Sequence, residues 1–251
     1  MKIEAILSPA ELPALAKRDL RGAACVVFDV LRATSTFVTA LHHGAKAIVP
    51  VSEIAEALAL RQKQPDILLG GERAGVRIRA AQTGGIDFDL GNSPREYTPE
   101  KVRGKTVVST TTNGTRALRA CAGAPTVLAA SFLNLTATAQ FIRRLQPAQI
   151  VLVCAGTREN IATEDVLAAG ALGEMLLRDA NGLAVPDSVE TARNAWRQAK
   201  SSLLEVVSEA ENARRLLAIP ELRDDVAFCL QQDIYPLVAK MEGGAVIRML
   251  R

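Results

Sequence analysis

KTVVSTTTNGTRAL, residues Lys105–Leu118, shows the unit from which this chain is built: a strand, a polar turn and a helix. Thr106–Val108 are β-branched and predict a strand, and Arg116–Leu118 begin a helical pattern. Between them lie four hydroxyl residues, Ser109–Thr112, followed by Asn113-Gly114. Such a turn directs hydroxyl and backbone N–H groups to one place at the positive end of a helix dipole, where phosphate binds. An ordinary helix N-cap is the alternative, but this polar run is longer than capping requires.

Strands and helices alternate along most of the sequence. We expect further strands at Lys2–Leu7, Ala24–Phe28, Ala47–Val51, Ile67–Leu69, Thr126–Ala130 and Ile150–Cys154. We expect helices at Pro9–Leu20, from about residue 30 to Gly44, and at Glu53–Lys63, Leu135–Leu145, Glu164–Leu177, Val189–Lys200, Ser202–Leu217 and Glu221–Gln232, with breaks at Asn181-Gly182, Pro186 and Pro220. This order predicts an α/β fold, a three-layer α/β/α sandwich with a mainly parallel or mixed central sheet. Two alternating runs around Glu242-Gly243-Gly244 predict a C-terminal β-hairpin, and the absence of a linker predicts one domain over residues 1–251.

Composition excludes several classes of function. Hydrophobic residues make up 49% of the chain, enough for a sizeable core, and the net charge is only +3, from scattered arginines. A mild positive charge without a basic run suits a small acidic ligand and argues against nucleic-acid binding. No apolar run approaches the ~20 residues that span a bilayer, and the N-terminus lacks a signal-peptide core, so we expect a cytoplasmic protein without a membrane partner. The oligomeric state is left open, with a homodimer as one alternative.

Cysteine and histidine usage argues against soft-metal chemistry. The four cysteines, Cys25, Cys121, Cys154 and Cys229, form no CxxC pair, which indicates a reducing compartment and no zinc site. Cys154 is followed too closely by an arginine to be a thiol-phosphatase nucleophile, so we expect a structural, partly buried thiol. The two histidines, His42 and His43, are adjacent near the end of a predicted helix, and we interpret them as surface residues.

Polar residues follow the predicted strands where each strand ends. Asp29 ends one strand, Glu72 another, Ser109–Thr112 a third and Cys154–Arg158 a fourth. In parallel sheets, ligands bind beyond the carboxyl ends of the strands. The residues that need an explanation therefore fall on one predicted edge of the sheet.

Asp29 comes directly after an apolar run, where an unpaired carboxylate would be costly. It is interpreted as a magnesium ligand or a nucleophile, or else as a partner of Arg32 in a salt bridge. Leu31 stands where haloacid-dehalogenase-type phosphatases have a second Asp, so that family is not supported. Arg32 itself suits phosphate, because its fork of donors matches two oxygens.

Further acids could complete a magnesium site. Glu72 and Arg73 lie beside flexible Gly70-Gly71 at a strand end, in a motif that is neither a Walker A loop nor a dinucleotide fingerprint. Glu164 and Asp165 follow Thr163, a predicted N-cap, and acids are common there for dipole reasons alone. Magnesium takes one or two carboxylates and keeps waters. The candidate metal ligands are Asp29, Glu72, Glu164 and Asp165.

Taken in order, the motifs resemble a known family. They are DVLRATST from Asp29, GGERAG from Gly70, FDLGNSP from Phe88, TTNGTRA from Thr111, and CAG followed by EDVLAAG from Glu164. Together they resemble 2-phosphosulfolactate phosphatase over about residues 25 to 175. The resemblance implies a magnesium-dependent hydrolase that converts 2-phospho-3-sulfolactate to 3-sulfolactate on the route to coenzyme M. The segment 76–87 is longer than the family pattern, and we expect it to line the part of the pocket that reads the sulfonate.

The resulting hypothesis is hydrolysis of a small anionic phosphomonoester. Magnesium polarises the phosphoryl group, Thr111, Thr112, Asn113 and Gly114 cradle phosphate oxygens, and Arg32 and Arg73 neutralise charge. We expect Asn92 and Ser93 to close over the substrate, with Asp29, Arg32, Glu72 and Arg73 as the catalytic group. The alternatives are a phosphatase for another phosphorylated hydroxyacid and a non-catalytic protein that binds an anionic metabolite. A kinase is disfavoured because the P-loop lysine is absent.

Overall fold

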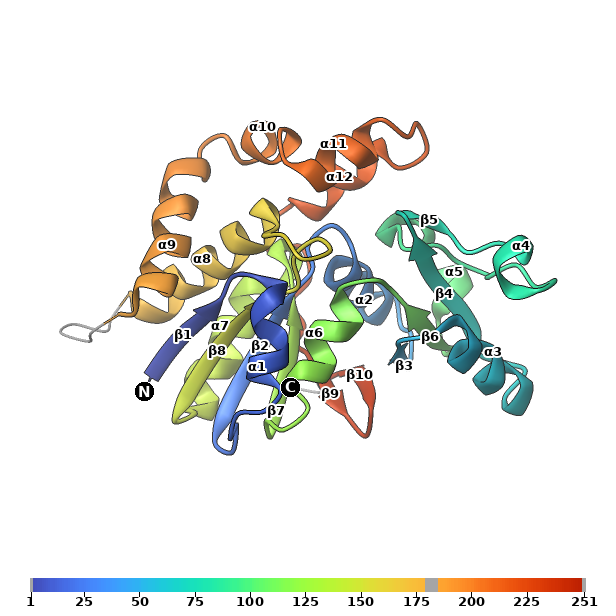
Figure 1. Ribbon diagram of the computed structural model, residues 1–251, viewed down its shortest axis with the longest axis horizontal. Helices are drawn as coiled ribbons and strands as arrows, with labels where there is room; N and C mark the ends of the chain where they lie inside the picture. The colour runs from blue at the N-terminus through green and yellow to red at the C-terminus, as the bar shows by residue number, and fades with distance from the viewer. Residues whose placement is uncertain (1, 179–184, 250–251) are drawn as a thin grey trace.

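One mixed β-sheet organises the residues that this computed structural model describes, 2–178 and 185–249 (Figure 1). Its ten strands in spatial order are β1 (Lys2–Ile6), β8 (Gln149–Cys154), β2 (Ala23–Phe28), β7 (Thr126–Ala130), β9 (Ala239–Glu242), β10 (Ala245–Arg248), β3 (Ala47–Val51), β6 (Thr106–Thr110), β4 (Leu68–Arg73) and β5 (Val76–Arg77). The predicted strands are all present, and the α/β class is confirmed.

The C-terminal hairpin joins two parallel blocks of this sheet. Strands β1, β8, β2 and β7 are mutually parallel, as are β3, β6 and β4. The hairpin β9–β10 lies between the blocks and pairs antiparallel with both, through Leu128–Lys240 and Ala129–Ala239 on one side and Val246–Ile48 on the other. The predicted hairpin is therefore confirmed, and it occupies the middle of the sheet.

Helices cover both faces of the sheet, as the three-layer prediction requires. The helices are α1 (Leu12–Leu15), α2 (Ala33–His42), α3 (Ile54–Lys63), α4 (Ala80–Thr83), α5 (Pro99–Val102), α6 (Gly114–Ala120), α7 (Leu135–Leu145) and α8 (Thr163–Leu177), with 3₁₀ turns at Pro9–Glu11, Pro94–Glu96 and Phe132–Asn134. Successive residues of a strand point to opposite faces. In β2, Val26 and Phe28 pack with α7 and α8, while Cys25 and Val27 pack with α2 and α6.

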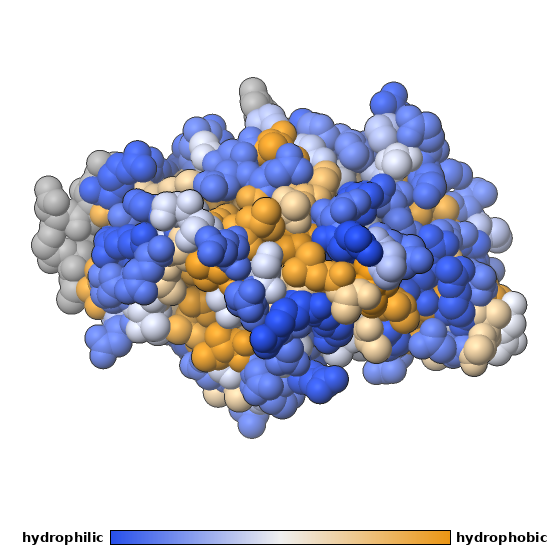
Figure 2. All heavy atoms as spheres, turned by 90° about the horizontal axis from the view of Figure 1, so that it is seen from above, coloured by the Kyte–Doolittle hydropathy of each residue, from blue (hydrophilic) through white to orange (hydrophobic). Residues whose placement is uncertain are grey.

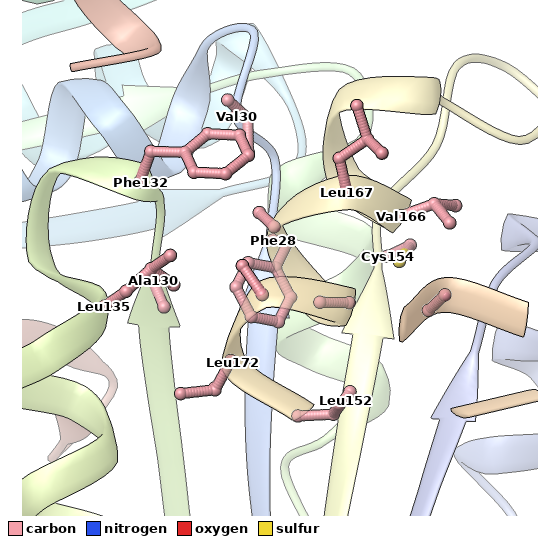
Figure 3. Packing of buried hydrophobic residues seen from close by; sticks show 14 of the residues in the cluster. Phe28, Val30, Ala130, Phe132, Leu135, Leu152, Cys154, Val166, Leu167 and Leu172 are labelled. Atoms are coloured by element: carbon pink, nitrogen blue, oxygen red, sulfur yellow. The ribbon is translucent and has the colours of Figure 1, made fainter. Parts of the chain in front are cut away.

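Phe28 is the centre of the first of these two cores. Figure 3 shows its ring with Phe132 above it and with Leu172 of α8 and Leu152 of β8 below it. All four side chains are completely or almost completely buried. This packing fixes the carboxyl end of β2, the point at which Asp29 follows.

A helical arm follows the sheet. It consists of α9 (Asp187–Ala199), α10 (Leu203–Ser208), α11 (Glu211–Leu217) and α12 (Arg223–Cys229), and it arches over one end of the sheet in Figure 1. Figure 2 views the molecule from above, the side on which Figure 1 shows α10–α12, and it shows apolar surface in the middle between two polar regions. Leu204, Val206 and Leu217 are among the exposed large apolar side chains.

Three predicted helices differ from the structure. The predicted Ser202–Leu217 helix is two helices, because Ala210 adopts an extended conformation (φ −73°, ψ 153°) between them. The predicted Glu221–Gln232 helix is confined to Arg223–Cys229. The predicted Pro9–Leu20 helix is a capped 3₁₀ turn followed by one helical turn.

Several smaller features complete the comparison with the sequence. The predicted break at Asn181-Gly182 lies outside the described residues. The four cysteines are unpaired and buried, and Cys154 is more buried than we expected. His42 and His43 are half-buried rather than free on the surface. The described residues contain no helix whose length and apolar character would let it cross a membrane.

Candidate active site

A cavity of about 270 Å³ opens where the ends of β2, β4, β6 and β8 meet the helical arm. Its lining residues are Asp29, Leu31, Arg32, Glu72, Ala74, Gly75, Asn92, Thr111, Thr112, Asn113, Thr157, Arg158, Asn212, Arg215 and Leu216. Four separate strand ends thus contribute to one hollow, as the polar residues at the strand ends predicted. The hollow combines carboxylates, hydroxyls and arginines.

Asp29 is held in place by the first residues of two helices. The Ala33 N–H donates to Asp29 Oδ1 at 3.0 Å, and the Gly114 N–H also donates to this carboxylate. The backbone N–H of Asp29 donates to Thr34 Oγ1 at 3.0 Å. The carboxylate is therefore fixed between α2 and α6, although it is almost completely buried.

Glu72 is fixed by three donors. Thr112 donates to Glu72 Oε1 with both its N–H (3.0 Å) and its hydroxyl (2.9 Å), and the Gly75 N–H donates to Oε2 at 2.7 Å. Thr112 was predicted to cradle phosphate, but in the structure its two donors serve Glu72. The carboxylate from β4 is thus tied to the turn after β6.

Glu164 and Asp165, the two acids of the first turn of α8, behave differently. Asp165 accepts the Val30 N–H at 2.8 Å and the Gly156 N–H at 3.0 Å, one on each oxygen. Glu164 accepts the Asn212 Nδ2–H on Oε1 at 2.7 Å, while its Oε2 is buried and has no partner among the described residues. Thr163, the predicted N-cap, is the first helical residue, and Ala162 occupies the cap position.

Burial and mutual repulsion shift the ionisation of these acids. Burial raises the pKa of Asp29 to about 6, and the negative charges of Glu72 and Glu164 add to this effect. Burial likewise raises the pKa of Asp165 well above its ordinary value, with further contributions from Glu164 and Asp29. Burial raises the pKa of Glu164, and its hydrogen bond with Asn212 opposes the shift. These carboxylates repel one another, and a cation would relieve that repulsion.

The donor set fits a hard cation such as magnesium. The cavity offers the carboxylate oxygens of Asp29 and Glu72, and oxygen ligands are those that magnesium prefers. No group of three or more His, Cys, Asp and Glu side chains in residues 2–178 and 185–249 is placed so that it could hold a metal ion. Magnesium needs only one or two protein carboxylates, since waters and substrate phosphate supply its other ligands.

Arg32 lines the cavity but is already paired. Its Nη1 lies 2.7 Å from Asp225 Oδ2 of α12, and its Nη2 donates to the Gly75 carbonyl. The proposed salt bridge between Asp29 and Arg32 is therefore wrong, because Arg32 turns toward the helical arm. Asp29 and Arg32 both precede α2, which begins at Ala33, so they do not share a face of that helix.

Arg73 and Ser93 are not brought to the cavity. Arg73 follows Glu72 on a strand, so its side chain points to the other face and donates to Thr110 Oγ1 at 3.1 Å. Ser93 donates to Asp225 Oδ1 at 2.7 Å. Asn92 does line the cavity, and its Oδ1 is buried without a partner among the described residues.

The turn after β6 supplies one wall of the cavity. Thr111, Thr112 and Asn113 line it, and Thr111 Oγ1 lies 3.4 Å from Thr115 Oγ1. Gly114 is set back against Asp29, where a Cβ would lie 2.8 Å from Asp29 Oδ2. Asn113 Oδ1 is buried without a partner in the described part of the chain.

The sequence did not predict the contribution of the helical arm. Asn212, Arg215 and Leu216 of α11 line the cavity opposite the strand ends. The expected role of segment 76–87 is wrong, because none of its residues lines the cavity. The segment instead forms β5 and α4 outside the cavity lining. The one local signal was a polar residue, Asn212, at a position that the helical pattern places in the core.

The sequence is similar to known proteins over most of its length. A family model described as 2-phosphosulpholactate phosphatase matches residues 9–244. A protein of Caldanaerobacter subterraneus subsp. tengcongensis is 38% identical over 231 residues, covering 91% of this chain and 92% of the relative. One of Pseudothermotoga lettingae is 41% identical over 215 residues (85% and 87%), and one of Clostridium acetobutylicum is 34% identical over 248 residues (98% and 100%). Each of the three bears the name "Probable 2-phosphosulfolactate phosphatase".

Proposed function

The chain belongs to the 2-phosphosulfolactate phosphatase family, and we propose that it hydrolyses 2-phospho-3-sulfolactate to 3-sulfolactate and phosphate with the help of magnesium. Family membership makes it a phosphomonoester hydrolase. The finer assignment, including a place on the route to coenzyme M, is our proposal. The observation that carries it is the meeting of Asp29, Glu72 and the Thr111–Asn113 turn in one small cavity.

We propose that two carboxylates, Asp29 and Glu72, hold the magnesium ion, because both line the cavity. Glu164 has a buried oxygen that is not hydrogen-bonded by any described residue, but it does not line the cavity. Asp165 suits an orienting role better, because both of its oxygens accept backbone N–H groups. When bound there, magnesium would polarise the phosphoryl group and neutralise part of its charge.

The residues of the chain supply positioning and charge. The Thr111 hydroxyl and the Asn113 amide are the groups of the polar turn that remain available to phosphate oxygens, since Thr112 is engaged with Glu72. Burial raises the pKa of Asp29 to about 6 in the metal-free site, and magnesium, when bound there, would keep this carboxylate ionised as its ligand. The cation Arg215 faces the same cavity from the helical arm.

A phosphate-release screen tests this function. The substrates are 2-phospho-3-sulfolactate, other phosphorylated 2-hydroxyacids and an aryl phosphate, each assayed with magnesium and with EDTA. We expect the highest kcat/KM for 2-phospho-3-sulfolactate, loss of turnover in EDTA and recovery when magnesium is restored. A clear preference for another phosphorylated hydroxyacid would show that the proposed substrate is wrong. Phosphate release that EDTA does not affect would show that the reaction does not need magnesium.

Two isosteric variants test the carboxylates. We expect Asp29→Asn and Glu72→Gln each to lower magnesium-dependent turnover by about 100-fold or more, because each removes a charge from the cavity. Glu159→Gln is the matched control, an acid outside the cavity lining that is two-thirds exposed and paired only with surface Arg116. Unchanged turnover in both Asp29→Asn and Glu72→Gln would contradict the carboxylate assignment.

A further inference from the structure

We propose that Arg215, held by Asn212, binds the second anionic group of the substrate, a sulfonate or carboxylate carried beside the phosphate ester. This inference rests on the proposed function and deepens it, because it names the residue that would select multiply charged phosphoesters over simple ones. It assigns a specificity role to α11, a part of the chain that follows the strand-end motifs by some 50 residues.

The position of Arg215 is set by a chain of hydrogen bonds that begins at the acids. Asn212 Nδ2 donates to Glu164 Oε1 at 2.7 Å, and Arg215 Nη2 donates to Asn212 Oδ1 at 2.7 Å. The two residues are three apart on α11, so they share one face of the helix, and both line the cavity. Asn212 also donates to the Thr157 hydroxyl. The amide is therefore fully engaged and holds the guanidinium at the cavity wall.

Arg215 is half-buried and forms no ion pair with a described residue, although its charge acts on Glu164. Its Nε is buried without a hydrogen-bond partner among the described residues, and its one acceptor there is a neutral amide oxygen. A buried donor without an acceptor is destabilising, and arginine presents a fork of donors that matches an oxyanion. The geometry therefore leaves an unsatisfied cation facing a small polar cavity.

The other arginines of the cavity do not fill this role. Arg32 already has a buried acidic partner, Asp225, and also donates to the Gly75 carbonyl. Arg158 lines the cavity but is exposed to solvent. Arg215 lies beside the turn after β4, since a Cβ on Gly75 would lie 3.8 Å from its Nε. Arg215 and the polar turn proposed for phosphate line the same cavity, so that one ligand with two anionic groups can contact both.

The test compares phosphate esters that carry different anionic groups beside the phosphate. They are 2-phospho-3-sulfolactate, 2-phospholactate, which lacks the sulfonate, and an aryl phosphate, which lacks both groups. We expect Arg215→Gln to lower kcat/KM for 2-phospho-3-sulfolactate about 10- to 100-fold, mainly through KM, and by at least ten times more than for the aryl phosphate. Arg215→Lys, which keeps the charge without the fork, should recover part of this loss.

The comparison with 2-phospholactate identifies the group that is read. If Arg215 binds the sulfonate, the wild-type preference for 2-phospho-3-sulfolactate over 2-phospholactate collapses in Arg215→Gln. If Arg215 binds the carboxylate, Arg215→Gln lowers kcat/KM equally for 2-phospho-3-sulfolactate and 2-phospholactate, and lowers it less for the aryl phosphate. Either pattern supports the proposal. An equal loss for all three substrates, or no loss for any, would overturn it.

Two controls separate this inference from the proposed function. Arg214→Gln changes an exposed arginine on the same helix, outside the cavity lining, and should leave all three rates within about twofold of wild type. Direct calorimetric binding of 3-sulfolactate to wild type and to Arg215→Gln tests the anion subsite without catalysis. Binding that weakens in Arg215→Gln supports the subsite even if no phosphoester is hydrolysed, and identical affinities would reject it.

Discussion

Arg32 and Asp225 form an ion pair in which Nη1 and Oδ2 are 2.7 Å apart, although the two side chains are only 2% and 0% exposed. The pair joins the loop after β2 to α12, and Ser93 adds a 2.7 Å hydrogen bond to the other Asp225 oxygen. It thus ties the helical arm to the edge of the sheet that carries the cavity. Arg215 and Asn212 depend on this connection for their position.

Removing the charge of Asp225 should loosen the arm. We expect Asp225→Asn to lower the free energy of unfolding by about 3–5 kcal/mol, because it leaves Arg32 as an uncompensated buried charge. Asp224→Asn is the control on the neighbouring residue, whose pair with Arg95 is exposed and should be worth about 0–1 kcal/mol. Urea unfolding of both variants measures the difference, and similar free energies would show that the buried pair does not hold the arm.

The hydroxyl of Thr112 offers a finer test of how Glu72 is held. Thr112→Val keeps the shape but removes the 2.9 Å hydrogen bond to Glu72 Oε1, whereas Thr112→Ser keeps it. A hydrogen bond to a charged group contributes about 1.5–3 kcal/mol, so we expect Thr112→Val to lower kcat/KM roughly 10-fold or more and to raise the magnesium concentration needed for half-maximal rate. Thr112→Ser should stay close to wild type. Equal rates in the two variants would indicate that the hydroxyl does not position Glu72.

The residues that sequence reasoning placed in the site lie at strand ends. Asp29 and Glu72 could be predicted because an acid that directly follows or ends a buried strand has few structural explanations. Parallel strands then bring such residues to one edge, which is a property of the topology rather than of any side chain. The polar turn at Thr111–Asn113 was predicted on the same basis, and it does line the cavity.

The residues that the sequence did not predict depend on packing between distant segments. Asn212 is a polar residue at a buried position of α11, but only the position of this helix over the cavity gives it a function. The partner of Arg32 is 193 residues away, so a nearby acid was the natural but wrong choice. The C-terminal hairpin was predicted as a unit, but its place between two parallel blocks follows from pairing that no local pattern encodes.

The raised pKa of Asp29 should make the stability of the metal-free protein depend on pH. The pKa of Asp29 is about 6 in the folded chain and near its ordinary value of 3.8 when unfolded, so the folded state binds more protons between these values. The stabilising contribution is complete below about pH 4 and is lost as the pH rises to about 6, by roughly 3 kcal/mol for a shift of this size. The pKa values of Glu164 and Asp165 are also raised in the folded chain, so these two acids change the stability in the same direction.

Urea unfolding in EDTA between pH 4 and pH 7 measures this dependence. We expect Asp29→Asn to remove the contribution of Asp29 to this pH dependence. The free energy of unfolding of the variant should therefore fall less steeply between pH 4 and pH 7 than that of wild type. Magnesium should flatten the wild-type curve as well, because a cation favours the ionised carboxylate. Parallel curves for wild type and Asp29→Asn would show that Asp29 titrates normally in the folded protein.

Gly114 tests whether the close approach of the polar turn to Asp29 is needed. A Cβ at this position would lie 2.8 Å from Asp29 Oδ2 and 2.9 Å from Ala33 Cβ, closer than such atoms approach, so one of these neighbours must move. Because Asp29 is fixed by the Ala33 and Gly114 N–H groups, we expect Gly114→Ala to displace the carboxylate and to lower kcat by about 100-fold. Overpacking should also lower the free energy of unfolding by about 1–3 kcal/mol.

Gly173→Ala in α8 is the matched control, since its Cβ would meet no atom closer than 3.5 Å and alanine favours the helix. If Gly114→Ala kept both the rate and the stability of Gly173→Ala, the close approach of the turn after β6 would not be what fixes Asp29.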